Sequence, residues 1–137
     1  MWNQEQDSEL LKILSNLRQT FHTYPELSGQ EKQTRETIRK FLQELGIETQ
    51  TFNEQYGLCG LIRGEQSGPV IALRADMDAL PITEENDVSY KSKHQGVMHA
   101  CGHDGHMAIL MGAAKMPMQN RHKLAGTVKL IFQPAEE

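Results

Sequence analysis

The sequence lacks the features that mark several common classes of protein. Its two cysteines, Cys59 and Cys101, can form at most one disulfide, which excludes a disulfide-dense scaffold and suits a reducing compartment. Its longest strongly apolar stretch, 107–114, is far shorter than the ~20 residues that span a bilayer. Its 14 Lys and Arg do not exceed its 18 Asp and Glu, so the net charge of -4 argues against nucleic acid or a membrane as a partner.

Several short signals are also missing. Residues 1–6 have no basic and apolar signal pattern, so we expect a cytoplasmic chain. No glycine pattern matches a phosphate-binding loop, Ser67 has no G-x-S-x-G context, and Cys101 has no local signature of a papain-like nucleophile. What remains is a globular composition, with 38% apolar residues and 11 glycines in 137 residues, a length that predicts one domain.

The apolar residues predict three helices, the first two from a stripe at helical spacing. The first covers 8–22. The second follows Ser28 and Glu31, which have the spacing of a capping box, and it ends at Gly46. The third, over 107–116, is apolar nearly all round, which predicts burial against a sheet, and Pro117 is expected to end or kink it.

Short β-prone runs predict strands at 47–52, 58–63, 70–75 and 127–132. Residues 70–73 are continuously apolar, which predicts a strand covered on both faces. The irregular, acidic segment 76–98 follows that strand, where α/β proteins usually place a site, although a solvated acidic loop explains the same composition.

The segment 98–106 combines three histidines, one cysteine and one aspartate. Thiolate and imidazole ligands suit a borderline-soft divalent ion such as zinc. Cys101 and His103 are two residues apart, so they can converge only from a looped backbone, which Gly102 permits. The alternative is a buried free cysteine beside histidines that cap the next helix.

One Cys and one His do not complete a zinc site, so carboxylates must contribute. Asp76 and Asp78 follow one predicted strand, and Glu136 and Glu137 follow another. Adjacent glutamates can divide the work, one binding the metal while the other acts as general base on an activated water. Taken alone, such a pair is more often a solvated pair of charges.

Four blocks, read together, resemble the metal-dependent amidohydrolases of the aminoacylase and carboxypeptidase superfamily, in the hippurate hydrolase and N-acyl-L-amino-acid amidohydrolase branch. The blocks cover 21–27, 73–82, 98–106 and 126–137. The resemblance implies an α/β fold, namely part of a three-layer α/β/α zinc-peptidase-like catalytic domain with a mixed sheet, incomplete at its C-terminus. Residues 1–137 are then the N-terminal part of that domain, without the inserted lid or dimerisation domain.

The resemblance also implies roles for individual residues. Cys101, His103 and Glu137 correspond to metal ligands, Glu136 to the general base, and Asp78 to the residue that orients a ligand or tunes the base. Supporting or structural roles are expected for His22, the Pro25–Glu26 turn, Asp76, His99, Asp104 and His106.

An intact site of this family holds two divalent ions, and the sequence leaves zinc, manganese, cobalt and nickel open. The implied substrate is a small N-acyl amino acid or related amide, and intact members are expected to be homo-oligomers. Two further histidine ligands have no counterpart in 1–137, so the chain is expected to be inactive alone. The alternatives are a non-catalytic metal-binding or interaction fragment that pairs through an open strand edge, and a truncated chain without function that aggregates through the same edge.

Overall fold

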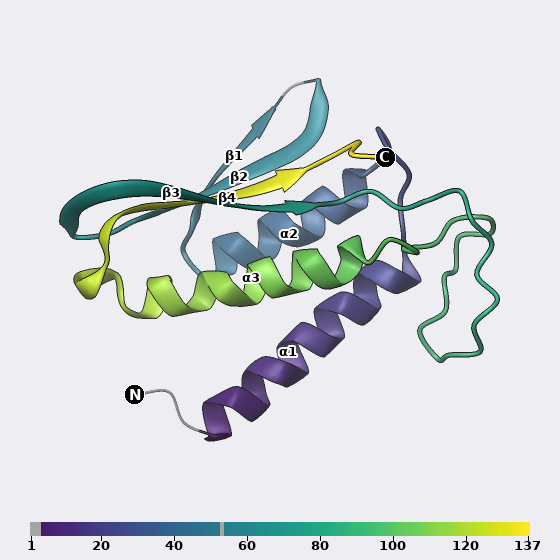
Figure 1. The fold of residues 1–137 in the computed structure, drawn as a ribbon, viewed down its shortest axis with the longest axis horizontal. Coiled ribbons are helices and arrows are strands. Elements are labelled where there is room, and N and C mark those ends of the chain that lie inside the picture. The colour runs from purple at the N-terminus through teal and green to yellow at the C-terminus, as the bar shows by residue number, and fades with distance from the viewer. Residues whose placement is uncertain (1–3, 53) are drawn as a thin grey trace.

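The computed structural model describes residues 4–52 and 54–137, which form a mixed sheet with three long helices on one side (Figure 1). In chain order the elements are α1 (Gln4–Thr23), α2 (Lys32–Glu44), β1 (Glu48–Phe52), β2 (Gln55–Arg63), β3 (Gln66–Asp76), α3 (His103–Gln119), a 3-10 turn (Arg121–Lys123) and β4 (Ala125–Gln133). The predicted α/β class with a mixed sheet is confirmed.

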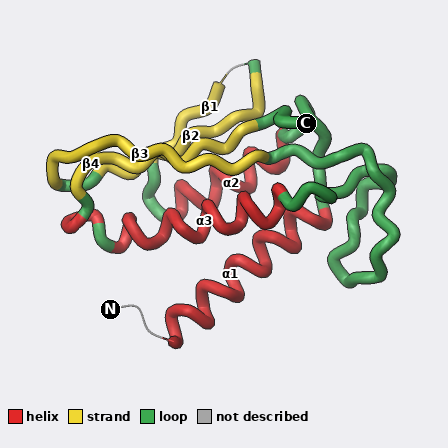
Figure 2. Tube along the Cα trace, in the orientation of Figure 1, coloured by secondary structure: helices red, strands yellow, loops and turns green. Residues whose placement is uncertain are grey.

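The sheet has the strand order β1-β2-β4-β3. The pairs β1–β2 and β2–β4 are antiparallel, whereas β3 and β4 run parallel, with Asp76 opposite Gln133. Because β3 and β4 are parallel, the residues that follow them emerge at the same end of the sheet. The long loop after β3 and the chain end after β4 lie together at that end in Figure 2.

The predicted helices all form, and each is longer than its apolar pattern. Gly46, at φ 77°, follows α2 in the left-handed conformation expected of it. Pro117 does not end α3 at its own position, because the helix continues to Gln119. Its missing N–H removes one hydrogen bond within the helix, and α3 ends two residues later. Within the described residues, no helix is both long and apolar enough to cross a membrane.

The predicted capping box at the start of α2 is wrong. Neither Ser28 nor Glu31 caps the helix with its side chain, because both bond to groups outside it. The cap comes from Glu26, whose carboxylate accepts the backbone N–H groups of Gln33 at 3.0 Å and Thr34 at 2.7 Å. Ser28 and Glu31 instead form hydrogen bonds with Asp78, which follows β3, and Ala135, which follows β4.

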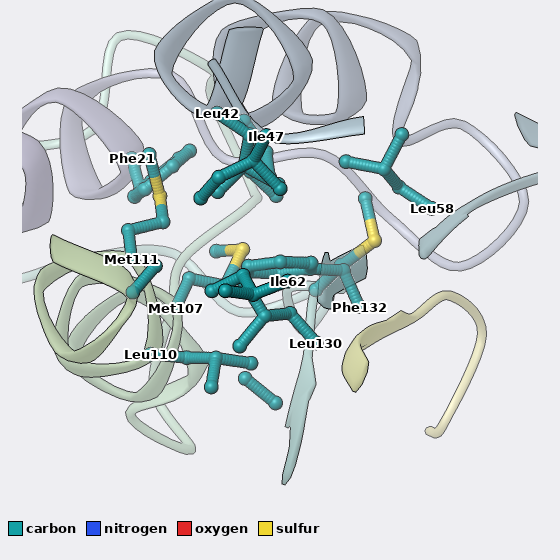
Figure 3. Close-up of a cluster of buried hydrophobic side chains, with 14 residues drawn as sticks. Phe21, Leu42, Ile47, Leu58, Ile62, Met107, Leu110, Met111, Leu130 and Phe132 are labelled. Atoms are coloured by element: carbon teal, nitrogen blue, oxygen red, sulfur yellow. The ribbon is translucent and has the colours of Figure 1, made fainter. Parts of the chain in front are cut away.

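The hydrophobic core lies between the sheet and the helices (Figure 3). Its largest fully buried apolar side chains come from α2, α3 and the two central strands. They are Ile38, Leu42, Leu58, Ile62, Met107, Met111, Leu130 and Phe132, with Met77 from the loop after β3. Each such side chain contributes roughly 1.5–3 kcal/mol through burial, so this core anchors β2, β4 and the start of the loop after β3.

The face of the sheet away from the helices has no helical layer among the described residues (Figure 1). The prediction that 70–73 is covered on both faces is therefore wrong. Val70 is 62% exposed and Ile71 54%, because β3 is an edge strand. The described chain holds two of the three layers that the resemblance implies.

Candidate metal centre

Three segments meet at the end of the sheet where β3 and β4 finish. The first follows β3 and carries Asp78, the second is the start of α3, and the third follows β4 and carries Glu136 and Glu137. Gly102 precedes α3 with φ at 92°, a conformation that L side chains rarely adopt. It allows Cys101 and His103, two residues apart, to approach the same point.

Ligand atoms from Cys101, His103 and Glu137 all lie within 4.8 Å of one another. Cys101 and Glu137 are exposed, whereas His103 is buried. The structure thus brings together the three residues that the resemblance assigned as ligands. One thiolate, one imidazole and one carboxylate form a donor set suited to zinc and to other borderline divalent ions.

A hydrogen bond from Nδ1, the ring nitrogen that faces away from the two glutamates, sets the orientation of His103. Its Nδ1 lies 2.9 Å from the backbone carbonyl oxygen of Asp78, and a carbonyl can only accept, so Nδ1 carries the proton and donates it. This leaves the lone pair on Nε2, which lies 3.7 Å from Glu136 Oε2 and 3.9 Å from Glu137 Oε1. The imidazole therefore presents its free nitrogen to the carboxylates.

Asp78 is buried and links the three segments. Its Oδ2 accepts the Ser28 hydroxyl at 2.6 Å and the Glu137 backbone N–H at 2.8 Å, and its Oδ1 lies 3.3 Å from His103 Nδ1. Burial acts to raise the pKa of Asp78, but the hydrogen bonds from Ser28 and from the Glu137 backbone outweigh it and hold the pKa below its usual value. An ionised carboxylate is thus kept beside His103.

A second cluster overlaps the first. Asp76, His103 and Glu136 also place ligand atoms within 4.8 Å of one another. Asp76 was assigned a supporting role from the sequence, and its carboxylate is also paired with Arg74 at 2.8 Å. The carboxyl ends of two parallel strands bring Asp76 and Glu136 together, as their places after two predicted strands allowed.

The donor set favours a cation. A hydrogen bond to the Glu137 carboxylate, together with the nearby charges of Glu136 and Asp78, raises the pKa of the Cys101 thiol. Three carboxylates beside a thiol disfavour the thiolate on their own, whereas a divalent ion among them favours it. The residues present therefore suit a bound divalent metal, whose positive charge would offset the repulsion among the thiolate and the carboxylates.

A buried polar network supports the start of α3. The His22 ring lies between two carboxylates, with Nδ1 2.7 Å from Asp104 Oδ2 and Nε2 2.9 Å from Glu84 Oε1. Arg18 Nε donates to the same Asp104 oxygen at 2.9 Å. The network joins α1, the loop after β3 and the residue next to His103, in keeping with the structural roles expected of His22 and Asp104.

His99 and His106 lie beside the cluster without joining it. His99 is buried next to a cavity of about 310 Å³ that Cys101 also lines, and burial lowers its pKa to about 4. Neither ring nitrogen of His99 has a hydrogen-bond partner among the described residues. The exposed His106 ring lies 6.0 Å from that of His103.

Comparisons with known proteins agree with the motifs. Residues 72–137 match the family described as Peptidase family M20/M25/M40. The resemblance to metal-dependent amidohydrolases of the aminoacylase and carboxypeptidase superfamily is confirmed by this match and by the relatives that follow. An N-acetyl-L-cysteine deacetylase of Bacillus subtilis is 50% identical over 130 residues, which are 95% of this chain and 31% of that protein. An N-acyl-L-amino acid amidohydrolase of Geobacillus stearothermophilus is 46% identical over 88% of this chain and 32% of its own length.

Among solved structures, a dinuclear metal binding peptidase of the M20 family from Bacillus subtilis superposes with a TM-score of 0.91 at 46% identity. The match covers 95% of this chain and 36% of that one. The chain therefore spans about a third of the length of the relatives it matches. Its fold is that of the matched part of this M20 peptidase structure.

Proposed function

We propose that this chain contributes part of the catalytic centre of a metal-dependent hydrolase that cleaves the amide bond of N-acyl amino acids. The observation that carries the proposal is the convergence of Cys101, His103 and Glu137 within 4.8 Å, with Glu136 beside them. The names of its relatives, a deacetylase of N-acetyl-L-cysteine and an amidohydrolase of N-acyl-L-amino acids, support this substrate class.

Each residue has a proposed task. The Cys101 thiolate, His103 Nε2 and the Glu137 carboxylate hold a divalent metal, which when bound supplies Lewis-acid polarisation of the amide carbonyl and activation of the attacking water. Glu136 takes the proton of that water on its carboxylate and later delivers it to the leaving amine. Asp78 holds His103 in the orientation that exposes Nε2.

The two clusters cannot be filled together by these residues. Both need an imidazole nitrogen of His103, and Nδ1 is already committed to the Asp78 carbonyl, so Nε2 can serve one ion at a time. We propose that an intact site holds two divalent ions, as the dinuclear M20 relative does, and that further ligands come from outside 1–137. The chain, as the N-terminal part of a catalytic domain, is then inactive alone.

Cobalt substitution tests the metal site directly. Titration of this chain with Co²⁺ is expected to show a thiolate-to-metal charge-transfer band that saturates at about one ion per chain. Cys101→Ser removes the band, whereas Cys59→Ser, at the other free cysteine, keeps it. Equal spectra for the wild type and Cys101→Ser contradict the ligand assignment.

Activity of the isolated chain is a separate measurement. We expect no turnover of N-acetyl or N-benzoyl amino acids above background by the metal-loaded chain. Turnover at ordinary enzyme rates contradicts the proposed need for further ligands while leaving the proposed metal site untouched.

The two free cysteines suit a reducing compartment such as the cytoplasm, where we place the protein.

A non-catalytic interaction fragment is the second candidate, favoured by the open edge of β3. Val70 and Ile71 are more than half exposed on that edge, and an unpaired strand can add a strand from another chain. Sedimentation of the metal-free and metal-loaded chain separates the two candidates. A soluble monomer in both states counts against the interaction fragment.

A further inference from the structure

The backbone just before the two glutamates is held in an unfavourable conformation. Ala135 has φ at 51°, the one positive φ found at a non-glycine residue within 4–52 and 54–137. Its Cβ makes this left-handed conformation unfavourable, so surrounding contacts must impose it. Ala135 directly precedes Glu136 and Glu137, so its conformation sets the direction in which both side chains leave the backbone.

One contact to this turn comes from a distant part of the chain. Glu31 Oε1 accepts the backbone N–H of Ala135 at 2.8 Å, across 104 residues of sequence. Glu31 is completely buried, and its other oxygen, Oε2, has no hydrogen-bond partner among the described residues. A buried carboxylate is costly when it lacks partners, so its bond to Ala135 is not an incidental surface contact.

The position of Glu31 makes this burial tolerable. Glu31 is the residue from which α2 begins, and the positive end of the helix dipole favours a negative charge there. Its side chain nevertheless does not cap α2, a task performed by Glu26. The Glu31 carboxylate is therefore free to reach across to the segment after β4.

We propose that Glu31 is a positioning residue that imposes the left-handed turn at Ala135 and thereby directs Glu136 and Glu137 toward His103. The proposal rests on the proposed roles of these two glutamates. Glu31 holds the N–H of Ala135, and Asp78 holds the N–H of Glu137, so the backbone is fixed on both sides of Glu136. With both anchors in place, the carboxylates lie 3.7 and 3.9 Å from His103 Nε2.

A conservative substitution separates positioning from charge. Glu31→Gln keeps the Oε1 acceptor and the shape of the side chain, whereas Glu31→Leu keeps only the bulk. The matched control is Glu54→Gln, because Glu54 lines the same cavity as Glu31 but is exposed. The first readout is the affinity of the chain for Co²⁺, and the second is the protection of the Ala135 amide from hydrogen exchange.

We expect Glu31→Leu to weaken Co²⁺ binding by about 10–100-fold, the range typical of residues that orient metal ligands. Glu31→Gln is expected to stay within about threefold of the wild type, and Glu54→Gln to be unchanged. Glu31→Leu should also lose the Ala135 amide protection that Glu31→Gln keeps. Equal affinity and protection in a folded Glu31→Leu chain overturn the proposal, as does Glu31→Gln binding as weakly as Glu31→Leu.

Two further outcomes are decisive. If Glu31→Leu does not fold, the proposal is tested by hydrogen exchange at the Ala135 amide of the wild-type chain. Exchange as fast as that of an unstructured amide overturns the proposal. Should the wild-type chain bind no Co²⁺, the proposed metal site fails. The positioning role then stands or falls on the amide protection alone, so the two failures are distinguishable.

Discussion

Asp78 Oδ2 accepts the backbone N–H of Glu137 at 2.8 Å, joining residues that are 59 apart in the sequence. The same oxygen accepts the hydroxyl of Ser28, and the other carboxylate oxygen lies 3.3 Å from His103 Nδ1. One buried carboxylate thus connects the segment before α2, the start of α3 and the end of the chain. Its loss should therefore alter the metal site, although Asp78 is not itself a proposed ligand.

Asp78→Asn tests this connection. Asp78 Oδ1 lies 3.3 Å from the protonated Nδ1 of His103, and Oδ2 accepts two donors, so the NH₂ of an asparagine faces an N–H or O–H group in either orientation. We expect Co²⁺ affinity to fall by about tenfold or more, measured by competitive titration. The control, Ser28→Ala, removes one donor and keeps the charge, so a larger loss in Ser28→Ala than in Asp78→Asn contradicts this account.

Acid stability should depend on Glu84. Burial acts to raise its pKa, but hydrogen bonds from the Ser92 backbone and from His22 outweigh it and hold the pKa below the ordinary value of 4.5. Because the folded pKa is lower than the unfolded one, the ionised carboxylate stabilises the fold above the unfolded pKa. That contribution is lost as the pH falls through the folded pKa.

The measurement is urea unfolding of the wild type and Glu84→Gln from neutral pH down to about pH 3. We expect a constant deficit in the free energy of unfolding for Glu84→Gln near neutral pH, which shrinks below the ordinary pKa. The neighbouring Glu85 is exposed, so Glu85→Gln should differ little from the wild type throughout. If the deficit of Glu84→Gln does not change with pH, ionisation of Glu84 does not contribute to the acid sensitivity of the fold.

Substitution at Gly126 should destabilise the start of the central strand β4. Gly126 has φ at 98°, and a Cβ there overlaps the carbonyl oxygen of Pro69, which is backbone and cannot rotate away. We expect Gly126→Ala to lower the free energy of unfolding by about 3 kcal/mol. Gly29→Ala is the control, because Gly29 also has a positive φ but has nothing within 4 Å, and it should cost about 1 kcal/mol.

Self-association should depend on the edge strand. Ile71 is 54% exposed on β3, whereas Leu11 is 64% exposed on α1, away from the sheet. We expect Ile71→Lys to shift sedimentation toward monomer while changing the free energy of unfolding by less than about 0.5 kcal/mol. Leu11→Lys should leave association unchanged, and an equal shift in both variants shows that the edge of β3 is not responsible.

Local patterns predicted the secondary structure because helices and strands depend on neighbouring residues. Apolar residues at helical spacing placed α1, α2 and α3, and Gly46 marked the end of α2. The pair Cys101 and His103 could likewise be identified, because both residues and the glycine between them lie in one short segment. The four motif blocks were sufficient to identify the resemblance to metal-dependent amidohydrolases.

Contacts between distant segments were decided by the tertiary structure. The spacing of Ser28 and Glu31 matched a capping box, yet both side chains bond to residues on other segments, Asp78 and Ala135. The apolar run in β3 matched a buried strand, yet strand order placed it at the edge. In each case several arrangements satisfy the same local pattern, and the packing of the whole chain selects one.

The sequence by itself therefore determined the resemblance to metal-dependent amidohydrolases, the helices and strands, and the residues capable of binding a metal. Only the tertiary structure decided which of them meet, because the parallel pairing of β3 and β4 brings Asp76, Asp78, Glu136 and Glu137 to one end of the sheet. The physical reason is that local propensity depends on neighbours within a few residues, whereas this metal centre depends on distances between segments as far apart in sequence as Asp76 and Glu137.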